Sequence, residues 1–178
     1  MAPVREATDF RGQGPAATAI MQDAGVYPWL LALSLLLIVR VTLAASTDLA
    51  EDEAYYWLWS KSLVASYYDH PPMIAYWIRA GTSLFGQTAF GVRVAGLMAT
   101  LAGSYLLYLT SLSLFRNRAA GLMAVFWLNA TLLFNAAAIV ATPDTPLAFF
   151  TTVALFAFAK LIETGRGAWW VASTRAGA

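Results

Sequence analysis

The chain has 178 residues, of which 60% are hydrophobic and only 12% are charged, which excludes an ordinary soluble domain, where about 25% of residues are charged. Its formal net charge of +1 excludes a broad basic surface that could neutralise a run of nucleic-acid phosphates. The absence of cysteine excludes disulfides, thiolate catalysis and thiolate metal sites, and leaves the redox compartment open.

Four apolar runs are long enough to cross a membrane, because a hydrocarbon core about 30 Å thick needs roughly 20 helical residues. They cover about 26–45, 91–115, 119–140 and 145–162. The sequence therefore predicts an all-α fold, a polytopic transmembrane helical bundle of about four spans. The polar residues 1–25 lack the order of a cleavable signal peptide, so the first run is predicted to be a retained helix.

The basic residues predict the orientation, since short loops rich in Lys and Arg stay cytoplasmic. Arg-Asn-Arg at 116–118 places that loop inside, so the N-terminus is also cytoplasmic. The inner set is then Arg5, Arg11, Arg116, Arg118, Lys160, Arg166 and Arg175, and the outer set is Lys61, Arg79 and Arg93. The acidic residues divide the other way, because Asp48, Glu51, Asp52, Glu53, Asp69 and Asp144 all fall outside. Two distant segments therefore bring carboxylates to one membrane face.

The first outer segment, about 47–90, is too long for a turn and is the candidate active region. Asp48 and Glu51 indicate a capping-box-like start, so EDEAYYWLWSKSLVAS is predicted to form a helix along the outer interface. Helical spacing places four side chains on one face: Asp52, Tyr56, Trp59 and Leu63. Trp and Tyr at headgroup depth are typical of interfacial helices. Asp-His-Pro-Pro at 69–72 ends this helix, and MIAYWIRAGTSLFG is predicted to form a second amphipathic helix that ends near Gly86.

Asp52 and Glu53 lie in the first turn of the interfacial helix, where free backbone N–H groups and the helix dipole favour negative charge. One interpretation is an ordinary acidic helix start. The other is a carboxylate that takes a proton from a hydroxyl acceptor beside a wall of aromatic rings. Burial beside those rings would raise its pKa and the helix start would lower it. The sequence does not decide between the two interpretations.

Asp144 lies in Ala-Thr-Pro-Asp-Thr-Pro, where it is predicted to be the N-cap of the fourth helix, a second carboxylate across a cleft, or both. His70 is the one histidine, and a lone loop histidine more often makes a local hydrogen bond than binds metal or transfers protons. A divalent cation held by oxygen atoms of Asp52, Glu53 or Asp69 together with His70 stays open as a cofactor, although no recognised ligand spacing supports it.

Three arginines lie within or beside the predicted spans, and their positions predict their roles. Arg40 lies within the first span, where a central cation costs at least about 2.5–3.5 kcal/mol on insertion scales, so we expect it to snorkel to the outer headgroups rather than find a partner. Arg79 and Arg93 flank the second amphipathic stretch and are predicted either to anchor the interface or to meet an anionic phosphate.

Three motifs follow one another: Glu-Asp-Glu-Ala-Tyr-Tyr-Trp after the first span, then Tyr-Tyr-Asp-His-Pro-Pro, and later Thr-Pro-Asp-Thr-Pro. From about Tyr27 to Trp170 this order resembles the N-terminal part of the dolichyl-phosphate-mannose protein mannosyltransferase-like family. That family includes bacterial lipid A aminoarabinose transferases and belongs to the C-type glycosyltransferase superfamily. The resemblance implies a multi-pass glycosyltransferase of the inner or plasma membrane that moves a sugar from a polyprenyl-phosphate donor to a hydroxyl acceptor. It also implies inversion, and a reaction on the non-cytoplasmic face.

The resemblance also implies residue roles. Asp52 matches the essential acidic residue of the first outer loop and is the predicted general base. Glu53 matches its acidic neighbour, and Asp144 matches the acidic residue of the second outer loop, which would position the acceptor or a cation. The predicted substrate-binding residues are Tyr56, Trp59, His70, Arg79 and Arg93. One of Arg40, Arg79 and Arg93, or a divalent metal, would stabilise charge on the leaving phosphate, and the lipid tail would lie in an apolar groove between helices.

Family members are longer chains with more spanning helices. Residues 26–170 are therefore expected to be the N-terminal part of a transmembrane glycosyltransferase domain, followed by a short polar tail (171–178) where the chain is truncated. The alternatives are a noncatalytic membrane remnant, a subunit that binds polyprenyl lipid, and half of a transporter. The spans carry few polar residues and no paired broken helices, which argues against the transporter. The acceptor is left open between protein, lipid A, another lipid and a polysaccharide.

Overall fold

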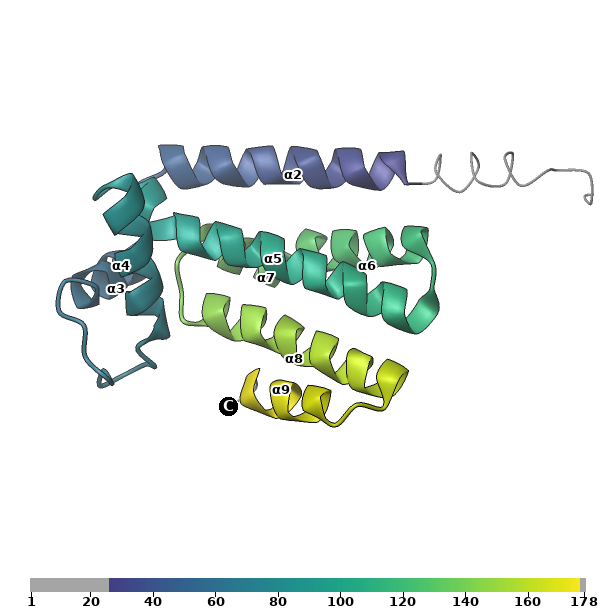
Figure 1. Ribbon diagram of the computed structural model, residues 1–178. Helices are drawn as coiled ribbons and strands as arrows, with labels where there is room; N and C mark the ends of the chain where they lie inside the picture. Colours follow the sequence, from purple (N-terminus) through teal and green to yellow (C-terminus); the bar gives the residue numbers. More distant parts are fainter. Residues whose placement is uncertain (1–25, 177–178) are drawn as a thin grey trace, which may run out of the picture.

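The computed structural model describes residues 26–176, which are helical and contain no strand. The predicted all-α fold is confirmed. The predicted cytoplasmic segment 1–25, with Arg5 and Arg11, lies outside the described residues, as do 177–178. With the labels of Figure 1, the helices are α2 (Tyr27–Ser46), α3 (Glu51–Trp59), α4 (Met73–Phe85), α5 (Ala89–Phe115), α6 (Arg118–Ala130), α7 (Leu132–Ile139), α8 (Asp144–Thr164) and α9 (Ala168–Ala176).

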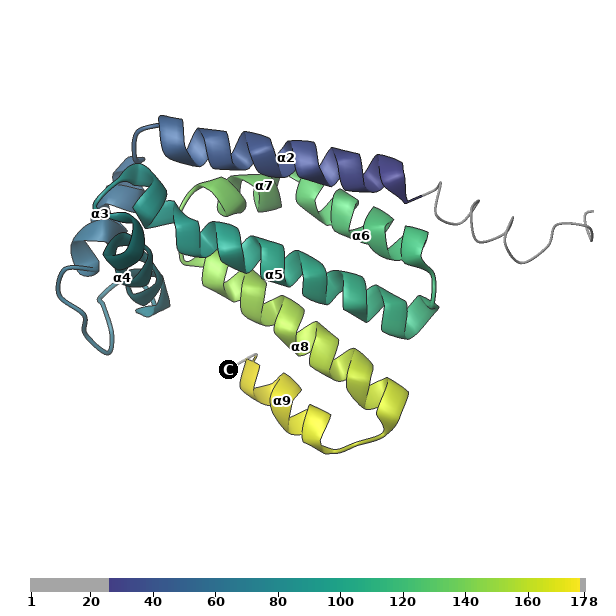
Figure 2. The same ribbon diagram turned by 45° about the horizontal axis from the view of Figure 1, so that its top comes forward.

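Three of these helices, α2, α5 and α8, are long and apolar enough to cross a membrane. They lie side by side with α5 in the middle (Figures 1 and 2). Their bounds confirm three of the predicted spans. The remaining predicted span, 119–140, is wrong as one continuous helix, because the chain breaks at Thr131 into α6 and α7. Each half is too short to cross alone.

Arg40 explains the break between α6 and α7. Its Nη2 donates a hydrogen bond of 3.0 Å to the main-chain carbonyl of Asn129, which in a continuous helix would accept from residue 133. Thr131 then adopts an extended backbone (φ −66°, ψ 135°), and its N–H donates to the carbonyls of Trp127 and Leu128. The expectation that Arg40 snorkels to the headgroups is therefore wrong, since the side chain is only 4% exposed and points into the bundle.

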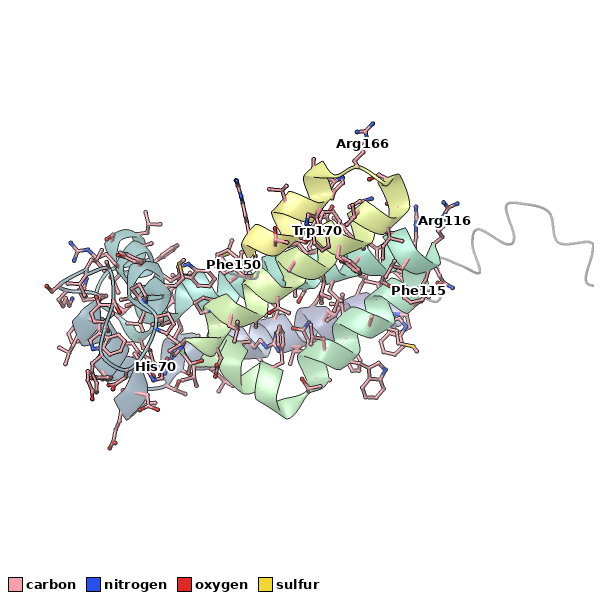
Figure 3. The ribbon with its side chains drawn as sticks, turned by 90° about the horizontal axis from the view of Figure 1, so that it is seen from below. His70, Phe115, Arg116, Phe150, Arg166 and Trp170 are labelled. Atoms are coloured by element: carbon pink, nitrogen blue, oxygen red, sulfur yellow. The ribbon has the colours of Figure 1, made fainter. Side chains whose placement is uncertain are left out.

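The two ends of the bundle differ in character. The short helices α3 and α4 lie across one end, and the α5–α6 and α8–α9 connections lie at the other (Figures 1 and 2). Figure 3 shows His70 at the first end and Arg116 and Arg166 at the opposite one. The aromatic and acidic first loop is thus separated from the cationic connections by the length of the spanning helices.

The interfacial helices differ from prediction in one case. The second, α4, matches its prediction and ends before Gly86, whose φ of 78° suits a residue without a side chain. The first, α3, is shorter than predicted and ends at Trp59, so Leu63 does not share its face. The Tyr67 hydroxyl lies at this end, 2.9 Å from the carbonyls of both Trp59 and Ser62, and the Trp59 carbonyl also accepts the N–H of Ser62.

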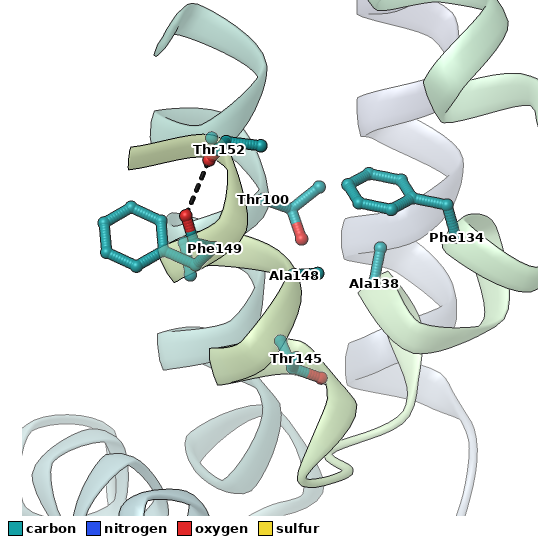
Figure 4. Close-up of a pocket in the computed structure, with 9 residues that line it drawn as sticks. Thr100, Phe134, Ala138, Thr145, Ala148, Phe149 and Thr152 are labelled. Atoms are coloured by element: carbon teal, nitrogen blue, oxygen red, sulfur yellow. Dashed lines mark hydrogen bonds between the residues drawn. The ribbon is translucent and has the colours of Figure 1, made fainter. Parts of the chain in front are cut away.

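Close packing fixes α8 against α5. A Cβ atom added at Gly96 would lie 3.1 Å from Thr145, and one at Gly103 would lie 3.0 Å from Thr152, seven residues further along each helix. Small residues at such spacing allow membrane helices to approach closely. Figure 4 shows the pocket left between α5, α7 and α8, with Phe134 opposite the α8 threonines; its volume is about 10 Å³, no more than one water needs. The N-terminus of α8 is therefore held firmly.

The predicted polar tail, 171–178, follows directly on the first residues of the last described helix. Its residues up to 176 belong to α9, which folds back along α8 (Figures 1 and 2). The Trp169 ring packs edge-on against Phe156 of α8, with ring centres 6.0 Å apart. Apolar contacts of this kind hold a short helix that could not persist alone.

Candidate active site

A buried ion pair joins the first interfacial helix to the central spanning helix. The Glu53 carboxylate of α3 accepts hydrogen bonds from Arg93 Nε (2.8 Å) and Nη2 (2.6 Å). Their side chains are 0% and 3% exposed. Paired charges of this fork geometry are the usual form in which a carboxylate and a guanidinium are buried together.

Arg93 also completes the end of α2. Its Nη1 donates to the carbonyls of Ala44 (3.2 Å) and Thr47 (2.9 Å) and to Thr47 Oγ1 (2.8 Å), and its Nη2 donates to the Asp48 carbonyl (2.8 Å). A cation at the last carbonyls of a helix is stabilised by the helix dipole. The predicted phosphate-binding role of Arg93 does not agree with this arrangement, because its donors are taken up inside the protein.

Glu53 ties this network to the loop before α8. Its Oε1 accepts the main-chain N–H of Ala141 at 2.8 Å, and its Oε2 accepts the N–H of Ala50 at 3.0 Å. Ala50 is the N-cap of α3, so the predicted start at Asp48 is wrong by two residues. Because Ala141 precedes Asp144 by one short turn, this hydrogen bond brings the first turns of α3 and α8 to the same end of the bundle.

The pKa of Glu53 reports how well the carboxylate is satisfied. Burial alone would raise its pKa, but the hydrogen bonds from Arg93, Ala141 and Ala50 outweigh burial and hold the pKa below its usual value. The group is therefore ionised at neutral pH, and a fully buried carboxylate with such partners cannot meet a substrate. The geometry suits a positioning residue rather than the catalytic group predicted for Glu53.

Asp52 and Asp144, by contrast, are both exposed. Burial raises the pKa of the neighbouring Tyr56 phenol, and the negative charges of three carboxylates raise it further; these carboxylates are Asp52, Asp144 and Asp69. The two predicted catalytic aspartates therefore lie near one phenol that stays protonated. Asp144 is the first residue of α8 rather than its N-cap, which is Pro143. This corrects the predicted capping role and leaves the carboxylate facing solvent.

Aromatic rings form one wall beside the aspartates. Tyr56, which is 7% exposed, packs edge-on against Trp59 and His70, with ring centres 5.2 and 5.8 Å apart. Trp59 also stacks in parallel on Tyr67 at 4.2 Å. The structure thus brings Tyr56, Trp59 and His70 together, as predicted for substrate-binding residues, although their contact with a substrate stays a prediction.

The remaining predicted cation, Arg79, is exposed on α4. Of the three arginines considered for phosphate binding it alone is not buried, since Arg40 and Arg93 bind groups within the protein. The Tyr55 hydroxyl donates to Asp69 at 3.0 Å, which uses one oxygen of a predicted metal ligand. Within residues 26–176 no three His, Asp or Glu side chains are grouped closely enough to hold a metal ion.

An apolar groove ends at Asp144. It has a volume of about 580 Å³ and is bounded by α5, α6, the break at Thr131, α7 and α8. Its walls include Leu107, Leu128, Phe134 and Leu147, and of the described residues that line it Asp144 is the one that carries a charge. Sequence reasoning expected such a groove but did not identify its residues, because the break that opens it was not foreseen.

Sequence reasoning also missed the Glu53–Arg93 pair and the role of Ala141. The signal for Arg93 was its surroundings, Phe-Gly-Val-Arg-Val-Ala-Gly, in which an arginine between apolar and small residues must find a buried partner. No sequence signal identified Ala141, since its contribution is a main-chain N–H.

Residues 69–178, more than half of the chain, match the family model described as dolichyl-phosphate-mannose-protein mannosyltransferase. The matched residues include Arg93 and Asp144 but begin after Asp52 and Glu53. A lipid A galacturonosyltransferase, RgtD of Rhizobium johnstonii, is 34% identical over 123 residues, which cover 66% of this chain and 25% of that protein. The chain thus spans about a quarter of this relative's length. No solved structure matches the chain.

Proposed function

Because the chain belongs to the dolichyl-phosphate-mannose-protein mannosyltransferase family, a family of membrane glycosyltransferases, we propose that it provides the lipid-facing catalytic part of such an enzyme. The donor is a sugar on a polyprenyl phosphate, and the acceptor is a hydroxyl group. The observation that carries this proposal is the hydrogen bond from Ala141 to Glu53, which joins the segments bearing Asp52 and Asp144 beside the end of an apolar groove.

The reaction requires a base, a path for the lipid and exclusion of bulk water. The acceptor oxygen forms a bond to the anomeric carbon while the bond from that carbon to the phosphate oxygen breaks, and its electron pair leaves with the lipid phosphate. Asp52 takes the proton of the attacking hydroxyl. Attack from the face opposite the phosphate inverts the anomeric carbon. Asp144 orients the acceptor at the mouth of the groove, and exposed Arg79 is the cation available to the phosphate.

The groove supports a lipid donor. An isoprenoid chain has no polar groups and fits walls of Leu and Phe, whereas a nucleotide sugar would need polar contacts along its length. The RgtD relative is named for galacturonosyl transfer to lipid A. We propose a saccharide lipid of the same kind as the acceptor, so that both substrates reach the site from the membrane.

The proposed orientation follows from charge. Arg116, Arg118 and Arg166 lie in or beside the connections at one end, which we assign to the cytoplasm. The aspartates then lie on the non-cytoplasmic face.

The test is transfer by membranes that contain the chain, given a radiolabelled polyprenyl-phosphate sugar and lipid A. Asp52→Asn is expected to abolish transfer, and Asp144→Asn is expected to lower it strongly. Glu51→Gln is the matched control, because Glu51 is an exposed acid in the same helical turn and is expected to leave transfer unchanged. Equal transfer by Asp52→Asn and the wild type would remove Asp52 as the base.

A noncatalytic protein that binds polyprenyl lipid is the second candidate, and the groove favours it independently of the aspartates. It predicts that the purified chain retains polyprenyl phosphate but transfers no sugar. Leu147→Trp on the groove wall would then lower lipid retention, while Asp52→Asn would leave it unchanged.

A further inference from the structure

Arg40 is a buried cation that the proposed reaction does not use. Its Nη1 donates to Asn129 Oδ1 at 2.6 Å, its Nη2 donates to the Asn129 carbonyl at 3.0 Å, and its Nε donates to Asn135 Oδ1 at 2.8 Å. All three acceptors are neutral. Among residues 26–176, the charge is therefore held within a spanning helix by neutral acceptors and not by the carboxylate that usually accompanies a buried arginine.

The partners of Arg40 are themselves fixed. The Asn129 side-chain amide donates to Ser104 Oγ at 2.9 Å and to the Val125 carbonyl at 2.8 Å. The network thus joins α2, α5, α6 and α7. An apolar side chain in place of Arg40 would avoid the cost of burying a charge, so packing alone gives no reason for an arginine at this position.

The acceptors lie on both sides of the helix break. Asn129 is near the end of α6 and Asn135 is within α7, so one guanidinium clamps the two half-helices at their junction. Beyond Asn135, α7 ends at Ile139, and the short loop that follows carries Ala141, whose N–H donates to Glu53, and leads to Asp144. Closing the break into a continuous helix would redirect α7 and move that loop.

We propose that Arg40 is a positioning residue that maintains the break between α6 and α7 and thereby holds the Ala141–Asp144 loop against Glu53. The planar guanidinium is required because it reaches three acceptors in fixed directions, which a lysine ammonium group cannot do. The consequence for catalysis rests on the proposed function, whereas the position of the loop does not.

The chain has no cysteine, so one introduced thiol reports on the loop without background. Thr142 suits this purpose, because its Oγ1 is buried and makes no hydrogen bond within the described residues. The Thr142→Cys protein, purified in detergent, is treated with a maleimide, and the labelling rate is measured in three backgrounds. These are Arg40→Met, Arg40→Lys and the exposed-site control Arg166→Met.

Arg40→Met is expected to raise the labelling rate about tenfold by opening the loop, and Arg40→Lys is expected to raise it nearly as much. Arg166→Met is expected to leave the rate unchanged. Combined with Glu53→Gln, Arg40→Met should add little, because both changes release the same loop. An unchanged rate in folded Arg40→Met, rescue by Arg40→Lys, or fully additive effects with Glu53→Gln would overturn the proposal.

If Arg40→Met does not fold, Asn135→Leu replaces it, since this change removes the α7 acceptor and keeps both hydrogen bonds to Asn129. The same rise in labelling is expected, and an unchanged rate would again overturn the proposal. Labelling needs no substrate. A chain that transfers no sugar but shows the predicted labelling pattern would therefore contradict the proposed function alone.

Discussion

Arg93→Met tests the buried ion pair that organises the site. It leaves the Glu53 carboxylate buried with two main-chain N–H donors in place of four hydrogen bonds, and it also frees the carbonyls of Ala44, Thr47 and Asp48. Removing one partner of a buried pair typically costs about 3–5 kcal/mol, because the remaining charge has no compensation. We expect a loss of unfolding free energy in this range, whereas Arg93→Met combined with Glu53→Leu should lose less, since no charge then remains buried.

The assay is denaturant unfolding in detergent, followed by circular dichroism. Lys160→Met is the matched control: it breaks the Lys160–Glu163 pair, whose oxygen and nitrogen are 2.6 Å apart but whose side chains are 29% and 35% exposed. Such solvated pairs contribute little. A loss for Arg93→Met no larger than that for Lys160→Met, or a double variant less stable than Arg93→Met alone, would refute the assignment of Glu53 and Arg93 as the organising pair.

Three further results are expected. Gly103→Leu should destabilise the chain by about 1–3 kcal/mol through overpacking, because its Cβ would lie 3.0 Å from Thr152 Oγ1. A lower cross-linking yield between cysteines introduced into α5 and α8 would show that the two helices have moved apart. Unchanged stability would contradict the close contact. Folding lowers the pKa of Glu53, so its stabilising effect should be present above pH 4.5, the usual pKa of a glutamate, and lost as the pH falls below that value. Thermal melts from pH 7 to 3 should show this loss in the wild type. An equal loss in Glu53→Gln would assign the pH dependence to other groups. Tyr67→Phe should cost about 0.5–1.5 kcal/mol because the carbonyls of Trp59 and Ser62 lose their contact with the hydroxyl. Hydrogen exchange should become faster only at the end of α3, and a uniform increase along the chain would contradict a local role.

The sequence predicts those features that depend on local composition. The length of apolar runs defines α2, α5 and α8, and the order of acidic, aromatic and proline residues indicates α4 and the family. The grouping of Asp52 and Asp144 at one end follows from counting spans and basic loops. It holds although the third predicted span is broken, because α6 and α7 together still carry the chain back to that end.

The features that sequence reasoning missed depend on contacts between distant segments. The spacing of residues alone leaves open whether Arg93 binds a phosphate or a carboxylate. Only the fold places Glu53, 40 residues away, within hydrogen-bonding distance. Arg40 lacks a nearby carboxylate in the sequence, and its partners, Asn129 and Asn135, look like isolated polar residues of a span. The break between them interrupts an apolar run that has no proline and whose one glycine, Gly121, lies ten residues before Thr131, so local propensity predicts a continuous helix.

The most direct measurement of the central claim is the proximity of residues 52 and 144. In the cysteine-free chain, Asp52→Cys with Asp144→Cys is treated with a short bismaleimide. Asp52→Cys with Arg116→Cys is the control pair, because Asp52 lies on α3 at one end of the bundle and Arg116 follows the 27-residue α5 at the other. Efficient cross-linking of 52 to 144, and none of 52 to 116, is expected. Equal yields for the two pairs, or none for 52 and 144, would contradict a shared site for the two aspartates.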